Sequence, residues 1–184
     1  MPGSLSTQAF GINDTGAIVG SFNLPGGSNG FLFIEGRFAT LSVPTGVTFA
    51  QAFGISDNGQ IVGNYFDAMG RLEGFVLEGE TFTPLHVPGS KQTRAFGINE
   101  KGQIVGDFQD VVGGGSHGFL YSEGTFTTLD VPRSVLTQAY GINDKGQIVG
   151  RYLGETVVPE PATWLLLASG ILGLVYFRKR RATS

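Results

Sequence analysis

The most evident lack in this sequence is cysteine: none of its 184 residues is a cysteine, and only two are histidine. Without cysteine the chain forms no disulfide and offers no thiolate metal site, so cysteine usage gives no indication of its compartment. Histidine is the most frequent general base in enzymes, and its scarcity leaves few candidates for catalysis. We therefore expect a protein that is not an enzyme, with no catalytic residues, no metal and no cofactor.

Basic residues are also scarce outside the C-terminus. Four of the twelve stand together at Arg178, Lys179, Arg180 and Arg181. The rest of the chain carries eight basic against fifteen acidic residues, a net charge of −7. Such a surface repels a phosphate backbone. We therefore expect no nucleic-acid partner.

A repeated segment fills most of the chain. Its copies begin at Ala9 (AFGINDTGAIVGSF), Ala52 (AFGISDNGQIVGNY), Ala95 (AFGINEKGQIVGDF) and Ala139 (AYGINDKGQIVGRY), at spacings of 43, 43 and 44 residues. A second unit lies between them, as in GFLYSEGTFTTLDVP from Gly118. Each unit has two short β-rich runs separated by a turn with Asn, Asp or Gly, which is typical of a hairpin. The sequence therefore predicts an all-β domain with four strands per repeat.

A period of 43 to 44 residues with four strands is the size of a propeller blade. We expect a partial or small β-propeller, and a β-solenoid is the alternative. The chain contains seven predicted hairpins, which correspond to three and a half blades of two hairpins each. The start MPGSLSTQAF matches the phrase VPGSKQTRAF that joins later repeats and lacks a signal peptide. Three interpretations stay open: an upstream continuation, which we favour, a ring completed by a second copy, or an open array.

The repeats resemble the extracellular HAF-type repeat. The resemblance is carried by AFGINDKGQIVG and GFLYSEGTFTTLDVP and their copies, and it covers residues 1–154. It implies an exported β-repeat domain and no established reaction.

One long uncharged run, from Ala162 to Phe177, follows the repeats. As a helix its sixteen residues would extend about 24 Å, somewhat less than the ~30 Å hydrocarbon core. Basic side chains that reach the interface, with Trp164 at the opposite one, would reduce this mismatch. A buried core helix is the alternative, but Gly170 and Gly173 would weaken it in water. We expect a transmembrane helix over 162–177, in contact with membrane lipid.

The basic cluster after this run sets the expected orientation, because Lys and Arg remain on the cytoplasmic side. Residues 178–184 are then a cytoplasmic tail. The repeat domain, residues 1–154, lies outside the cytoplasm and is joined to the span by a proline-containing linker over 155–161.

The linker ends in Val158, Pro159, Glu160 and Pro161. Followed by the apolar run and the basic cluster, these residues resemble the PEP-CTERM sorting signal of exopolysaccharide-producing Gram-negative bacteria. The resemblance implies recognition by exosortase, a membrane transpeptidase that removes the tail. It also implies residence in the inner membrane, followed by transfer to the cell surface or secretion. Proline favours extended backbone, which a protease can bind, although the same residues would also suit a plain linker.

Few polar residues of the repeats are candidates for chemistry. His86 occupies the position of Ser42 and Asp130 in other repeats, so we expect an exposed strand residue. His117 follows Ser116 in the stretch GGGSHG, where we expect a flexible loop at Gly113 to Gly115 and no catalytic pair. The stretch also lacks the lysine of a phosphate-binding loop.

Two further sets of residues recur once per repeat. The turn acids could bind calcium, but each turn supplies too few carboxylates, so we expect them to stabilise their turns. The phenylalanines could stack on a glycan, but regular recurrence is more typical of core packing. The acids are Asp14, Asp57, Glu100 and Asp144, and the phenylalanines are Phe31, Phe75 and Phe119.

These features predict an exported cell-surface or extracellular-matrix protein, sorted at its C-terminus by exosortase, with a structural or binding β-repeat domain. The alternative is a glycan-binding or glycan-cleaving propeller at the surface. Its site would lie on loops 66–73 and 109–117, with extracellular polysaccharide as the partner. A third interpretation, a bitopic membrane protein, would keep residues 164–181 in the mature chain.

Overall fold

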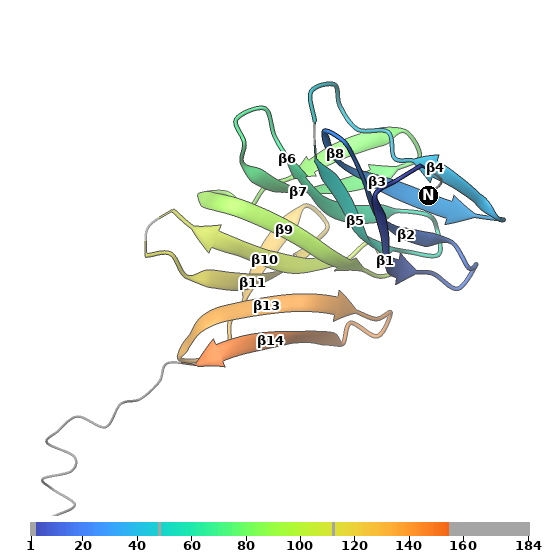
Figure 1. Cartoon of the computed structure of the whole chain (residues 1–184). Coiled ribbons are helices and arrows are strands. Elements are labelled where there is room, and N and C mark those ends of the chain that lie inside the picture. The colour runs from blue at the N-terminus through green and yellow to red at the C-terminus, as the bar shows by residue number, and fades with distance from the viewer. Residues whose placement is uncertain (1–2, 48, 112, 155–184) are drawn as a thin grey trace, which may run out of the picture. The chain divides into compact units, whose positions relative to one another are not determined.

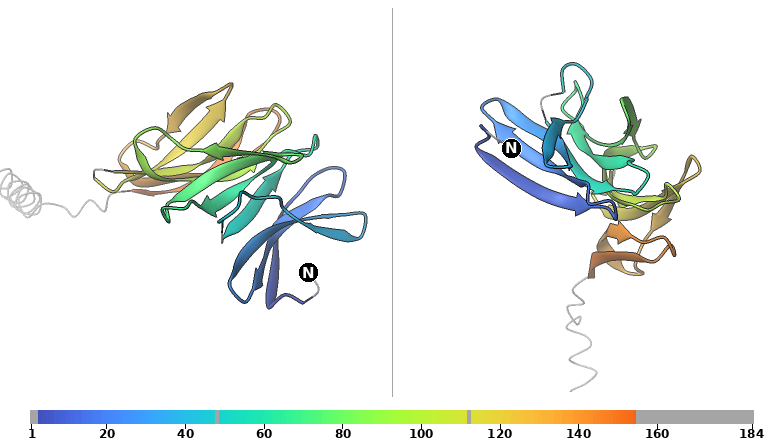
Figure 2. Two further views of the ribbon diagram at one scale, coloured as in Figure 1. Left: turned by 90° about the horizontal axis from the view of Figure 1, so that it is seen from above. Right: turned by 90° about the vertical axis from the view of Figure 1, so that its right-hand side faces the viewer.

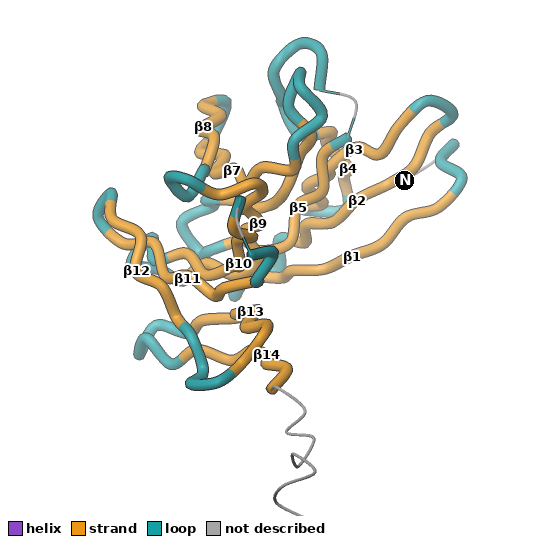
Figure 3. The backbone as a smooth tube through the Cα atoms, turned by 90° about the vertical axis from the view of Figure 1, so that its left-hand side faces the viewer, coloured by secondary structure: helices purple, strands orange, loops and turns teal. Residues whose placement is uncertain are grey.

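The computed structural model describes residues 3–47, 49–111 and 113–154, which form fourteen strands and no helix (Figures 1 and 3). The strands are β1 (Ser6–Ile12), β2 (Ile18–Leu24), β3 (Gly27–Ile34), β4 (Arg37–Thr40), β5 (Ala50–Ile55), β6 (Ile61–Phe66), β7 (Leu72–Glu78), β8 (Thr81–Leu85), β9 (Ser90–Ile98), β10 (Ile104–Asp110), β11 (Ser116–Ser122), β12 (Thr125–Leu129), β13 (Ser134–Ile142) and β14 (Ile148–Gly154).

The strands within each repeat pair with one another in antiparallel fashion. The first forms β1–β4 and the second forms β5–β8, both in sequence order. The third forms β9–β12, and a single parallel pairing of Ser116 with Leu136 connects it to β13 and β14 of the fourth. The predicted all-β class is therefore confirmed, with four strands in each of the first three repeats. None of these sheets closes on itself.

The first turn of each repeat is held by one polar side chain. In the third repeat, Asn99 Oδ1 accepts hydrogen bonds from the backbone N–H groups of Lys101 and Gln103, at 3.1 and 3.0 Å. Gly102 in the same turn has φ of 70°, which glycine adopts without strain. The second turn is tighter, since only Glu123 and Gly124 separate β11 from β12, and both have positive φ.

A glycine and a phenylalanine pair across the middle strands of each complete repeat. Gly106 on β10 lies opposite Phe119 on β11, as Gly63 does opposite Phe75. The rings of Phe75 and Phe119 are fully buried, because each occupies the space that a side chain on its partner glycine would take. The expectation that these phenylalanines are core residues is confirmed, and Phe31 is likewise buried.

The core lies between successive sheets. Val19 of the first repeat packs in one cluster with Ala52 and Ile55 of the second, and Val62 of the second packs with Ile98 of the third. Figure 2 shows these sheets following one another from blue through green and yellow to orange. Each repeat therefore buries its apolar face against the next repeat, as in other repeat proteins.

Residues 1–154 form one compact unit and residues 155–184 form a second. The second lies outside the described residues, and with it the linker, the predicted transmembrane helix and the basic tail. Within the described ranges there is no helix long and apolar enough to cross a membrane.

Candidate functional site

The predicted sorting, span and topology residues all lie outside the residues that the structure describes. They are Val158, Pro159, Glu160, Pro161, Ala162, Trp164, Phe177, Arg178, Lys179, Arg180 and Arg181. The structure does describe the two loops that the glycan-binding alternative requires, together with both histidines and all four turn acids. These loops, histidines and acids are the candidates for binding or catalysis in the repeat domain.

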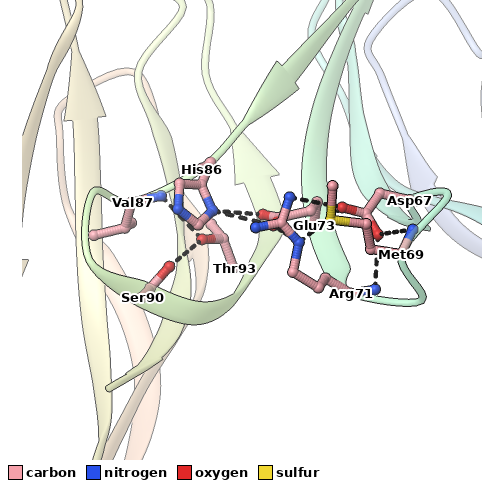
Figure 4. A network of polar contacts seen from close by, with 8 residues as sticks. All are labelled: Asp67, Met69, Arg71, Glu73, His86, Val87, Ser90 and Thr93. Carbon is pink, nitrogen blue, oxygen red and sulfur yellow. Dashed lines mark hydrogen bonds and ion pairs between the residues drawn. The ribbon is translucent and has the colours of Figure 1, made fainter. Parts of the chain in front are cut away.

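The loop between β6 and β7 is closed by Asp67. Its carboxylate accepts hydrogen bonds from the backbone N–H groups of Met69 and Arg71 at 2.8 Å, and from Nε of Arg71 at 2.8 Å (Figure 4). The backbone hydrogen bond from Arg71 is the main reason that the pKa of Asp67 is lowered. The polar groups of this loop therefore bond to one another.

Next to this loop, Glu73 on β7 is almost fully buried and pairs with His86. The distance from His86 Nδ1 to Glu73 Oε2 is 2.9 Å, and Arg71 Nε lies 3.8 Å from the other carboxylate oxygen (Figure 4). His86 is exposed, as expected, but it directly follows the end of β8 and so does not lie within a strand. A buried carboxylate requires such partners, because it has lost its hydration.

The second loop holds His117 between two carboxylates. Nδ1 of His117 lies 2.8 Å from Asp130 Oδ2, and Nε2 lies 3.0 Å from Asp110 Oδ2. The imidazole also stacks on Phe108, with ring centroids 5.2 Å apart. Gly113, Gly114 and Gly115 lie in the loop between β10 and β11, whereas Ser116 and His117 belong to β11. Ser116 bonds to a different carboxylate, so the two neighbours do not form a catalytic pair.

Both histidines take part in the same kind of pair. An acid and a histidine occupy two equivalent positions of successive repeats, with the two residue types exchanged. Glu73 pairs with His86, and at the equivalent positions of the next repeat His117 pairs with Asp130, each pair thirteen residues apart. The sequence contained a sign of this pairing, because one repeat has an acid followed by a histidine and the aligned positions of the next have a histidine followed by an acid. We conclude that these pairs join the third and fourth strands of their sheets.

Burial by itself lowers the pKa of His117, but the hydrogen bond and charge of Asp130, and then those of Asp110, outweigh it and raise the pKa above the ordinary 6.5. Because the folded-state pKa is raised, protonation of His117 stabilises the fold below the unfolded-state pKa. This contribution is lost as the pH rises through the raised pKa.

Replacing His117 by glutamine should therefore lower the free energy of unfolding more at about pH 6 than at about pH 9. Urea denaturation of the wild-type and H117Q chains at both pH values measures this difference. In an NMR titration, Asp130→Asn should lower the pKa of His117. Asp144→Asn, on a turn of the next repeat, should leave it unchanged. An equal loss of stability at both pH values would contradict the expectation.

A set of polar side chains that the sequence did not predict as a group connects successive repeats. Asp107 on β10 is buried and bonds to Arg94, to Ser116 at 3.0 Å and to Gln138 of the next repeat. At the equivalent position of the second repeat, Asn64 accepts a hydrogen bond from the backbone N–H of Ala95 at 2.8 Å. The side chain at this position thus contacts the following repeat in each case.

The turn acids also connect repeats, which corrects the expectation that each stabilises its own turn. The backbone N–H of Asp14 donates to Oδ1 of Asp57 at 2.7 Å, that of Asp57 donates to Glu100, and that of Glu100 donates to Oδ1 of Asp144 at 2.9 Å. The carboxylates of Asp57, Glu100 and Asp144 are thus each used by the turn of the preceding repeat. No group of three or more potential metal ligands occurs among the residues that the structure describes.

Comparison with known proteins adds information on the C-terminal tail. Residues 157–181 match the family model described as the PEP-CTERM protein-sorting motif. No curated protein matches the chain. The match covers the predicted sorting residues, span and basic cluster, and it does not extend to the repeats. It supports a protein that transits the membrane and is sorted at its C-terminus to the cell surface, with exosortase as the processing partner.

Proposed function

We propose that this chain is a surface or extracellular-matrix protein whose repeat domain is exported, held briefly in the inner membrane and released when exosortase removes its tail. The observation that carries the proposal is the sorting motif over 157–181, which begins directly after the compact unit ends at Gly154.

We infer that the repeats are HAF-type and that each sheet is a blade of an incomplete β-propeller. The first two repeats form separate four-stranded sheets with their strands in sequence order, and this arrangement favours blades over a solenoid. Such a domain serves as a structural or binding module. We propose that it is a sorting substrate rather than an enzyme, because the polar side chains of both candidate loops bond to one another.

Processing of the tail tests the proposed function. We expect the mature protein from an exosortase-containing host to lack residues 164–181, as measured by mass spectrometry of the intact protein. A host without exosortase should retain them. A bitopic membrane protein would retain them in both hosts, and that result would overturn the proposal.

Replacing Glu160 by glutamine should abolish most of this processing, because it removes the charge between Pro159 and Pro161 that the enzyme encounters. Glu155→Gln is the matched control, since Glu155 lies outside the matched motif, and it should be processed normally. The readout is the ratio of full-length to shortened protein in membrane fractions. Equal processing of the two variants would show that the motif is not what is recognised.

The glycan-binding alternative is tested on the same material. Immobilised extracellular polysaccharide of the host should not retain the mature protein if the repeats are structural. Retention that disappears when Asp110 and Phe108 are replaced would favour the alternative, because these side chains surround His117 on the second loop.

A further inference from the structure

The four copies of the first unit contact one another in the same way at every step. Each copy carries an aromatic side chain beside a β-bulge or register shift of its first strand, and this ring packs against the ring of the next copy. The ring centroids are 4.9 Å apart for Phe10 and Phe53, 5.5 Å for Phe53 and Phe96, and 5.4 Å for Phe96 and Tyr140. The same ring contact therefore recurs between each pair of successive copies.

The glycine after each ring lets the two backbones approach closely. A Cβ on Gly11 would lie 2.6 Å from the carbonyl oxygen of Phe53, and a Cβ on Gly97 would lie 3.0 Å from that of Tyr140. The hydrogen bonds of the turn acids make the contact between copies asymmetric, because the backbone N–H of one copy donates to the carboxylate of the next copy. Every copy therefore has one donor face and one acceptor face.

Equivalent residues show how the exposure of these faces differs between the inner repeats and the first and fourth repeats. Val105 is fully buried in the third repeat, whereas Val149 at the same position of the fourth repeat is 66% exposed. Ile55 is 8% exposed in the second repeat, whereas Ile12 at the same position of the first is 67% exposed. The difference arises because no described repeat covers the donor face of the fourth copy or the acceptor face of the first.

These are the two kinds of face that pack together between successive repeats within the chain. A hollow lies on each, lined on the fourth repeat by Gly141, Ile142, Asn143, Gln147, Ile148 and Val149 and on the first by Ala9, Phe10, Gly11, Ile12 and Ile18. The side chain of Asp14 has no hydrogen-bond partner among the described residues, and the backbone N–H of Asp144 is at the position that donates to a carboxylate in every earlier repeat.

We propose that the fourth repeat of one copy binds the first repeat of a second copy, head to tail. In this contact Tyr140 packs against Phe10, Val149 and Ile12 enter a shared apolar layer, and the N–H of Asp144 donates to the carboxylate of Asp14. The two faces differ, so the association is heterologous and produces rings or linear assemblies of the sorted protein.

Cross-linking of the full chain in detergent tests this contact, because the natural sequence has no cysteine. We would mix purified Ile12→Cys and Val149→Cys chains and treat them with a short bismaleimide. Both positions are exposed in a single copy, so the substitutions leave the fold intact. The mixture should give a cross-linked dimer, and neither variant alone should. Cross-links within one variant, or none in the mixture, would overturn the proposal.

Sedimentation velocity gives a second, independent measurement. Ile12→Asp should weaken association at least about tenfold, because it places an unpaired carboxylate in an apolar contact. Met69→Asp is the matched control, since Met69 is 82% exposed on the loop after β6 and should leave association unchanged. A wild-type chain that stays monomeric up to about 100 μM, well above the usual affinity of a specific interface, would contradict the proposal. Equal behaviour of the two variants would also contradict it.

Discussion

Gly106→Ala should destabilise the repeat domain by at least about 3 kcal/mol, a large part of the ~5–15 kcal/mol typical of a domain. A Cβ at this position would overlap the carbonyl oxygen of Arg94 and lie 2.7 Å from the ring of Phe119. The ring is fully buried and has no alternative space, so either the pairing of β9 with β10 or the ring must shift. Circular dichroism during urea denaturation of the full chain measures the loss.

The control for this substitution is Gly154→Ala, at the end of β14, where a Cβ would meet no atom within 4 Å. Its free energy of unfolding should stay within about 0.5 kcal/mol of wild type, as for most surface substitutions. If Gly106→Ala were equally neutral, the pairing of glycine with phenylalanine would not be the basis of the core.

Replacing Arg94 alone by glutamine should cost about 3 kcal/mol, since it leaves the buried Asp107 carboxylate without its cationic partner. Ser116 and Gln138 remain as partners, but neither supplies a positive charge. The free energy of unfolding from urea denaturation gives the size of the loss.

The natural second repeat supplies the control for this experiment. Gln51 and Asn64 occupy there the positions of Arg94 and Asp107 in the third. The double substitution Arg94→Gln, Asp107→Asn should therefore recover most of the stability that the single one loses, because no unpaired charge is left. A double variant as unstable as the single one would show that the loss has another origin.

The sequence was sufficient to predict strands and turns because both depend on neighbouring residues. The turn from Asn99 to Gly102 is formed by one side chain and one glycine within five residues, and its chemistry can be recognised in the letters. Recurrence at 43 to 44 residues then predicted an array of four-stranded repeats.

The partners of the polar residues could not be predicted in the same way. His86 and Glu73 are thirteen residues apart and meet only when two strands pair. The acid of one turn meets the backbone of another 43 residues away only when two repeats pack. Such distances cannot be read from the sequence, and a turn acid therefore suggests only a role in its own turn.

The sequence by itself determined the all-β repeat and the sorting motif, since hairpin chemistry and a proline segment before an apolar run act through residues close together in the chain. Only the tertiary structure decided which face of each repeat meets which. The reason is physical: Val105 and Val149 stand in nearly the same sequence, yet one is buried and the other exposed, because burial depends on the presence of a neighbouring repeat.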